Sequence, residues 1–189
     1  MELKRTNGGF TLWLTGLSGA GKTTIARIVS AELVRSGHLV EELDGDVVRE
    51  HLSQELGFSK QDRDANVERI GWLASRLTRH GAAVVVSSIS PYEDTRSRVR
   101  AMVEEFGPFV EVYVRAGIED CARRDPKGLY RRALAGEIEN FTGLSDPYEP
   151  PSDPELVVDT AGEPARRSAQ RVLAKLAELQ VPPATSVAA

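Results

Sequence analysis

Hydrophobic positions along the chain form short apolar runs separated by stretches with helical patterns. The apolar runs are rich in β-branched and aromatic residues, which predicts strands over residues 10–15, 38–43, 82–88, 109–114 and 155–159. The stretches between and after them predict helices over residues 24–35, 47–55, 61–80, 94–106 and 164–179, with a short one near 129–135. Because strands alternate with helices, we expect one α/β domain over residues 1–189, with a parallel sheet and helices on both faces.

Two stretches depart from this alternation. Residues 125–154 contain many prolines and glycines and little apolar periodicity. A long irregular segment inside a compact domain is usually functional, which favours a mobile lid over about residues 125–151. A surface excursion without a function is the alternative. Residues 181–189 are mostly small, and we expect them to form a disordered tail.

The predicted first strand and first helix are joined by a glycine-rich motif. Residues 16–23 read Gly-Leu-Ser-Gly-Ala-Gly-Lys-Thr and match G-x-x-x-x-G-K-[ST], the phosphate-binding P-loop. Glycines let backbone N–H groups close around phosphate oxygens, and the start of the helix adds partial positive charge. Lys22 is placed to reach the outer phosphates of a nucleotide, and the Thr23 hydroxyl is a ligand for Mg²⁺.

Composition narrows the class of protein further. The chain has 189 residues and a formal net charge of −4, with both signs mixed along it, so no nucleic-acid footprint is expected. A single cysteine, Cys121, excludes an intrachain disulfide and a cysteine-rich zinc site. There is no signal peptide and no long apolar run, so we expect a soluble cytoplasmic protein without a membrane partner.

Other motifs separate the classes of P-loop protein. The guanine-reading Asn-Lys-x-Asp is absent, and residues 159–162 match the GTPase motif D-x-x-G only at a place far from the P-loop. Asp44 and Asp46 end a predicted strand, and ligands of open α/β sheets bind at such carboxyl ends. A carboxylate there accepts a proton from an attacking hydroxyl or holds a Mg²⁺-bound water. The alternative is an acidic turn in which Asp46 caps the next helix.

Together the motifs resemble those of one family, the adenylylsulfate kinases. The resemblance spans roughly residues 8–163 and rests on the P-loop together with Leu43–Asp46, Leu56–Ser59, Asp62, Arg63, Asn66, Ile89–Pro91, Asp125–Tyr130 and Asn140–Gly143. It implies a P-loop kinase that uses ATP and Mg²⁺ to phosphorylate the 3′-hydroxyl of adenosine 5′-phosphosulfate (APS). The products would be 3′-phosphoadenosine 5′-phosphosulfate (PAPS) and ADP. The resemblance also implies a homodimer and makes ATP sulfurylase a candidate functional partner in sulfate assimilation.

The resemblance assigns roles residue by residue. ATP binding falls to Gly16, Ser18, Gly19, Ala20, Gly21, Lys22, Thr23 and Thr24, with Thr160 and Glu163 on the side of the nucleotide base. APS binding falls to Asp46, Arg49, Phe58, Arg63, Asn66, Ile89, Ser90, Lys127, Asn140 and Phe141. The catalytic candidates are Lys22, Asp44, Ser90 and Lys127, and the Mg²⁺ candidates are Thr23 and, through water, Asp44.

Two questions stay open at the level of sequence. A kinase for another small hydroxyl substrate, and a regulatory nucleotide-binding module without turnover, share the P-loop but need fewer of these motifs. Ser90 matches a serine regarded in bacterial members as a phosphoryl-enzyme candidate. We favour direct transfer to APS instead, because no histidine or carboxylate lies beside Ser90 in the sequence to activate it.

Overall fold

The computed structural model describes residues 8–181. Its strands are β1 (Phe10–Thr15), β2 (Val40–Asp44), β3 (Ala83–Ser87), β4 (Phe109–Arg115) and β5 (Leu156–Asp159). Its helices are α1 (Lys22–Arg35), α2 (Gly45–Leu52), α3 (Lys60–Arg79), α4 (Glu93–Glu104), α5 (Ile118–Arg124), α6 (Leu129–Leu134) and α7 (Ala165–Glu178). The tail predicted over 181–189 lies, apart from Val181, outside the described residues.

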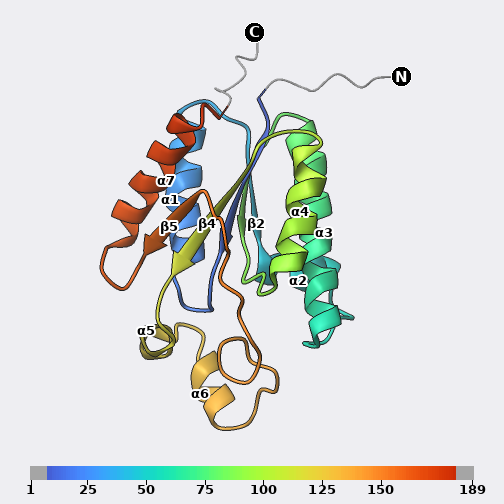
Figure 1. Ribbon diagram of the computed structural model, residues 1–189, viewed down its shortest axis with the longest axis vertical. Helices are drawn as coiled ribbons and strands as arrows, with labels where there is room; N and C mark the ends of the chain where they lie inside the picture. Colours follow the sequence, from blue (N-terminus) through green and yellow to red (C-terminus); the bar gives the residue numbers. More distant parts are fainter. Residues whose placement is uncertain (1–7, 182–189) are drawn as a thin grey trace.

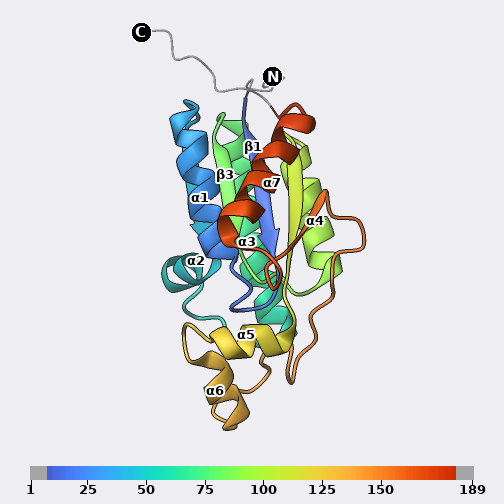
Figure 2. The same cartoon turned by 90° about the vertical axis from the view of Figure 1, so that its left-hand side faces the viewer.

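The strands form one parallel sheet in the order β2-β3-β1-β4-β5. Helices α1 and α7 cover one face, and α3 and α4 cover the other (Figures 1 and 2). The predicted architecture, a parallel sheet with helices on both faces, is therefore confirmed. The chain runs from β1 toward the β2 edge and crosses to the other half only after β3. A crevice is expected at such a switch point, at the carboxyl ends of β1 and β3.

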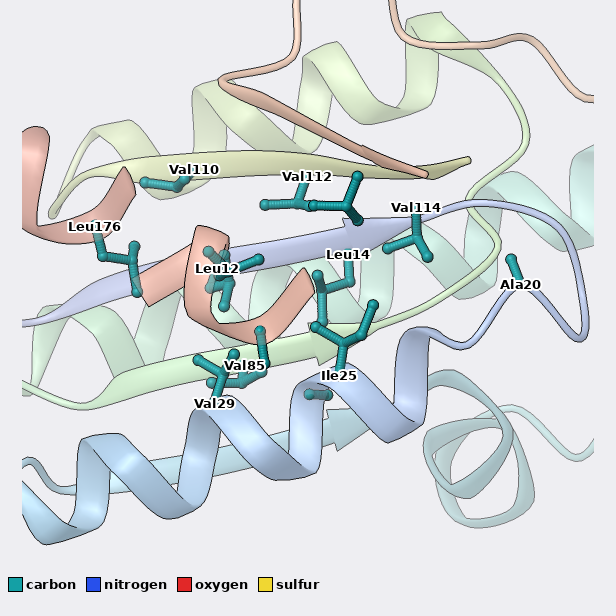
Figure 3. Packing of buried hydrophobic residues seen from close by; sticks show 14 of the residues in the cluster. Leu12, Leu14, Ala20, Ile25, Val29, Val85, Val110, Val112, Val114 and Leu176 are labelled. Carbon is teal, nitrogen blue, oxygen red and sulfur yellow. The ribbon is translucent and has the colours of Figure 1, made fainter. Parts of the chain in front are cut away.

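The side chains of the central strand alternate between two cores. Leu12 and Leu14 are buried with Val85 against α1 and α7 (Figure 3). Trp13, fully buried, points to the opposite core with α3 and α4. A strand buried on both faces reads as a continuous apolar run, which is why β1 and β3 were predictable from sequence.

Helices α1 and α2 each begin two residues earlier than predicted, because the residues before them set the start of the helix. Helix α1 begins at Lys22, inside the P-loop motif, because Gly21 takes φ +100° and turns the chain directly into the helix. Helix α2 begins at Gly45 because Asp44 is its N-cap and accepts a hydrogen bond from the Asp46 amide at 2.9 Å. The alternative reading, in which Asp46 caps this helix, is therefore wrong.

The remaining differences are small. Strand β2 begins at Val40, two residues later than predicted, and the ring of His38 packs edge-on against Phe10. Helix α5 was not predicted, because its seven residues are too few to show a period. Among the described residues, no helix is long and apolar enough to cross a membrane.

Candidate active site

A cleft of about 1890 Å³ opens at the carboxyl ends of the strands. The P-loop, the start of α2, the loop after β3 and the 125–151 segment all contribute to its walls. Of the predicted site residues, all line this cleft or lie in it except Gly16. Gly16 lies behind the P-loop at φ +146°, where a Cβ atom would stand 2.4 Å from the Val114 carbonyl oxygen. Only glycine fits there, so Gly16 allows the backbone of the P-loop to pack against β4 and does not itself line the cleft.

Lys22 is held against its own loop. The ammonium donates hydrogen bonds to the carbonyl oxygens of Gly16 and Leu17, each at 2.8 Å. Burial lowers the pKa of Lys22 to about 8, although the nearby Asp46 carboxylate acts in the opposite direction. The charge therefore stands at the mouth of the P-loop in a poorly solvated place, where an anionic ligand would stabilise it.

Oxygen atoms gather around Asp44. Its carboxylate accepts hydrogen bonds from the Thr23 hydroxyl at 2.9 Å, the Ser87 hydroxyl at 3.0 Å and the Asp46 amide at 2.9 Å. Partial burial raises the pKa of Asp44, but these hydrogen bonds outweigh it and hold the pKa below its ordinary value. Ser87 was missed by the sequence analysis, because its contact with Asp44 depends on the pairing of β2 with β3.

This oxygen cluster fits Mg²⁺ in its chemistry. Mg²⁺ prefers oxygen ligands and is usually held by one or two protein groups together with substrate phosphates and water. Thr23 and Asp44 supply a hydroxyl and an ionised carboxylate next to the P-loop. Within residues 8–181, no group of three or more His, Cys, Asp or Glu side chains converges as a dedicated metal cage.

An aromatic and basic surface forms the other end of the cleft. The Phe58 ring is 54% exposed, with the Arg49 guanidinium 4.4 Å and the Arg63 guanidinium 5.6 Å from its centroid. Asn66 is buried nearby, and its Oδ1 has no hydrogen-bond partner. An unpaired buried carbonyl oxygen costs free energy unless a ligand donates to it. Phe141, by contrast, is nearly buried, with its ring edge-on to Tyr130 at 4.9 Å.

Ser90 is more enclosed than its place after a strand suggested. Only 1% of it is exposed, although it belongs to the cleft wall. Its hydroxyl accepts from the Trp13 indole at 3.0 Å and donates to the Thr15 hydroxyl at 3.1 Å. None of its hydrogen-bond partners is a carboxylate or an imidazole.

The 125–151 segment is attached to the opposite wall of the cleft by polar contacts. The Lys127 ammonium forms an ion pair with Asp46. Arg63 donates to the Asn140 carbonyl and lies 3.6 Å from the Asp146 carboxylate. These contacts join residues about 80 positions apart, and they enclose the cleft between the segment and the helices α2 and α3.

Thr160 and Glu163, assigned to the side of the nucleotide base, make different contacts in the fold. The Thr160 hydroxyl donates to the Ala20 carbonyl at 2.8 Å, so Thr160 lies against the P-loop, and its role on the side of the nucleotide base stays a prediction. Arg124, which the sequence analysis missed, donates to the Thr160 hydroxyl at 3.1 Å. Glu163 accepts a hydrogen bond from Ser168 at 2.8 Å and pairs with Arg171 at 3.2 Å. The Glu163 carboxylate therefore binds side chains of α7, and its role in ATP binding stays a prediction.

The fold and the cleft define a P-loop kinase: a parallel sheet, a phosphate loop with its lysine, and an acid, Asp44, at the carboxyl end of β2 that accepts a hydrogen bond from Thr23 of the P-loop. Comparison with known proteins narrows this class. The family model described as adenylylsulphate kinase matches residues 8–159, and the chain belongs to this family. The resemblance stated from the motifs is thereby confirmed.

Individual relatives agree over nearly the whole chain. The adenylyl-sulfate kinase of Synechococcus sp. is 59% identical over 153 residues, which are 81% of this chain and 85% of the relative. The adenylyl-sulfate kinase of Microcystis aeruginosa is 53% identical over 171 residues, 90% of this chain and 93% of the relative. The APS kinase of Mycobacterium tuberculosis, solved in complex with AMPPNP and APS, is 40% identical with a TM-score of 0.87, covering 91% of this chain and 99% of that one.

Proposed function

We infer that this chain transfers the γ-phosphoryl group of ATP to the 3′-hydroxyl of APS, giving PAPS and ADP. The observation that carries this inference is that one cleft holds two different sites: a phosphate loop at one end and the Phe58–Arg49–Arg63–Asn66 surface at the other. Its volume of about 1890 Å³ exceeds the range of roughly 300–1,000 Å³ that holds one small ligand. The cleft therefore has more room than one small ligand needs, which supports a donor and an acceptor bound together.

On the donor side, the P-loop amides and Lys22 would hold the phosphates of ATP. The ammonium already stands at the loop mouth, and phosphate oxygens would replace the carbonyls of Gly16 and Leu17 as its acceptors. Thr23 and Asp44 would hold Mg²⁺, which neutralises charge on the transferred phosphoryl group when bound. Asp44 suits a metal better than a proton, because three hydrogen bonds already stabilise its ionised form.

On the acceptor side, the chemistry of APS matches the residues present. The exposed Phe58 ring offers a face to a purine, and the guanidinium groups of Arg49 and Arg63 offer charge to the phosphosulfate. The unpaired Oδ1 atom of Asn66 would accept a hydrogen bond from an N–H or O–H group of APS. The 3′-hydroxyl of APS attacks the γ-phosphorus directly, the bond between the γ-phosphorus and the bridging oxygen of ADP breaks, and the hydroxyl proton leaves to solvent.

A coupled ATP assay with APS, with other small hydroxyl acceptors, and with no acceptor tests this function. We expect ADP release that depends on APS. Equal turnover with a sugar or nucleoside acceptor would favour a different small-molecule kinase, and no turnover with any acceptor would favour a regulatory module. A homodimer and an ATP sulfurylase partner are implied by the family alone, and a place in the cytoplasm was inferred from sequence composition; all three stay predictions.

Substitution of Ser90 tests the route of transfer. Because its hydroxyl is hydrogen-bonded to Trp13 and Thr15 and has no base beside it, Ser90→Ala should keep kcat/KM within roughly tenfold of the parent. The variant should also unfold more easily, by about 1–2 kcal/mol, because the buried Trp13 N–H loses its acceptor. Steady-state kinetics and denaturant unfolding measure both. A loss of several orders of magnitude, with ³²P-labelled enzyme trapped only in the parent, would establish a covalent route.

The 125–151 segment should act as a lid. Bound ATP and APS would add contacts to Lys127 and Phe141 and keep water away from the reacting phosphate. Limited proteolysis measures this: cleavage between Asp125 and Pro151 should slow when AMPPNP and APS are both present. Cleavage after Arg35, which is exposed at the end of α1, serves as the internal control, and a segment cleaved at one rate in all conditions is not a closing lid.

Nucleotide binding should take up protons near pH 8. Because burial lowers the pKa of Lys22 to about 8, a fraction of the free enzyme carries a neutral amine there. Triphosphate anions would raise this pKa again, so binding favours the protonated form, and affinity should rise as pH falls from 9 to 7. Isothermal titration in buffers of different ionisation enthalpy measures the uptake. Lys22→Ala provides the control, in which this uptake should vanish.

A further inference from the structure

The far end of the 125–151 segment is docked on the loop that carries Ser90. The Tyr92 hydroxyl donates to Asp146 at 2.8 Å, and the Glu149 amide donates to the Pro91 carbonyl at 2.8 Å. The Glu93 amide in turn donates to the Glu149 carboxylate at 2.7 Å. Residues 146–149 and 90–93 therefore form one contact, which we call the return contact.

A buried arginine lies beneath the return contact. Arg96 is 2% exposed, and its guanidinium donates to the Ser90 carbonyl at 2.7 Å and to the Glu149 carbonyl at 2.8 Å. Its Nε lies 3.0 Å from the Glu111 carboxylate, which balances the buried charge. Ser90 itself has φ +41°, a conformation that non-glycine residues seldom adopt. The Arg96 side chain thus stabilises the unusual backbone conformation of Ser90 and holds the end of the 125–151 segment in place.

A second link runs through hydroxyl groups, and its direction follows from counting protons. The Thr15 hydroxyl has one proton, which it donates to the Ile89 carbonyl at 2.7 Å. The Ser90 carbonyl, at 3.5 Å, is a more distant acceptor, so the Thr15 oxygen accepts from its two hydroxyl partners, Ser90 at 3.1 Å and Tyr148 at 3.0 Å. The Ser90 oxygen in turn accepts from the Trp13 indole. Tyr148 thus belongs to the chain of hydrogen bonds that orients Ser90.

We propose that Arg96 and Tyr148 are positioning residues for the phosphoryl acceptor. They join the end of the 125–151 segment to the Ser90 loop, so the acceptor side of the cleft keeps its shape only while the return contact is made. This proposal rests on the proposed function, because it assigns the Ser90 loop to the acceptor. No site role was expected for either residue from the sequence, where Tyr148 only belongs to the family-like stretch Asp146–Glu149, and neither lines the cleft itself.

A double-mutant cycle with Tyr148→Phe and Ser90→Ala tests the link through Thr15. Tyr148→Phe removes one hydroxyl and leaves the ring stacked on Tyr113 at 5.9 Å. It should raise KM for APS about fivefold and leave kcat and KM for ATP within twofold. In the Ser90→Ala background the same substitution should change KM for APS less than twofold. Tyr113→Phe is the matched control, because it removes a phenol hydroxyl from the same pair of stacked rings but leaves the hydrogen bonds of Thr15 and Ser90 intact. Additive effects of Tyr148→Phe and Ser90→Ala would overturn the link.

Arg96→Lys tests the other link, because a lysine keeps the charge but not the fork that spans two carbonyls. It should raise KM for APS more than it lowers kcat. Arg98→Lys, on the same helix with a surface ion pair to Glu68, should change neither constant. An Arg96→Lys enzyme that is folded and has the parent's KM for APS would overturn the role of Arg96.

A substrate-free readout separates this inference from the proposed function. The chain has two tryptophans, and Trp72 is 60% exposed on α3, so Trp72→Phe leaves Trp13 as the single indole reporter. In that background Tyr148→Phe should shift the Trp13 indole N–H resonance in NMR spectra, and Tyr113→Phe should not. An unshifted resonance would overturn the chain of hydrogen bonds whatever the enzyme phosphorylates. A parent enzyme inactive with APS, yet with the shift present, would overturn the proposed function and with it the acceptor role of this contact.

Discussion

Replacing Lys22 with alanine should lower kcat by about a thousandfold or more, equivalent to roughly 4 kcal/mol of transition-state stabilisation. The ammonium of Lys22 stands at the mouth of the P-loop, and its hydrogen bonds to Gly16 and Leu17 hold it where transferred phosphoryl charge would develop. Removing it leaves that charge without its main protein cation. Steady-state kinetics with APS and ATP measure the loss.

The fold should survive this substitution. Burial lowers the pKa of Lys22 to about 8, so the charged ammonium, which is still the main form at neutral pH, is less favourable in the folded than in the unfolded chain. Lys22→Ala should therefore keep or raise the melting temperature, and APS binding should largely persist. Lys175→Ala, which removes a lysine paired with Glu178 on α7, is the matched control and should keep full activity. Near-normal turnover in Lys22→Ala would remove the basis for the donor site.

Replacing Asp44 with asparagine should lower kcat about a hundredfold or more while changing KM for APS much less. The ionised carboxylate of Asp44 is stabilised by three hydrogen bonds, among them one from the Thr23 hydroxyl. An amide keeps an oxygen to accept from the Asp46 N–H, so helix α2 stays capped, but the negative charge is lost. If Asp44 holds the metal, the variant should also need a higher Mg²⁺ concentration for half-maximal rate.

Asp46→Asn is the matched comparison, because it removes the other carboxylate of the same turn. Asp46 pairs with Lys127 across the cleft, so its loss should raise KM for APS more than it lowers kcat. A larger fall in kcat for Asp46→Asn than for Asp44→Asn would mean that the two roles are exchanged. Kinetics at several Mg²⁺ concentrations distinguish these outcomes.

Much of the fold was predictable because it depends on local patterns. The apolar runs of β1 and β3 are buried on both faces, and the P-loop motif carries its own turn and helix start. The order of the strands was not predictable, since no short pattern states which strands pair. Asp44 meets Ser87 only because β2 pairs with β3, and this pairing completes the oxygen cluster beside Thr23.

The class of this protein, its family and a set of site residues, all but one of which line the cleft, followed from the sequence, because phosphate binding needs particular residue types at fixed spacing. The contacts of each side chain became clear only in the folded protein. It showed Asp44 as the cap of α2, Glu163 tied to α7 and Ser90 enclosed between Trp13 and Thr15. These roles depend on contacts between residues far apart in the chain, and burial in the packed fold determines which polar groups find partners.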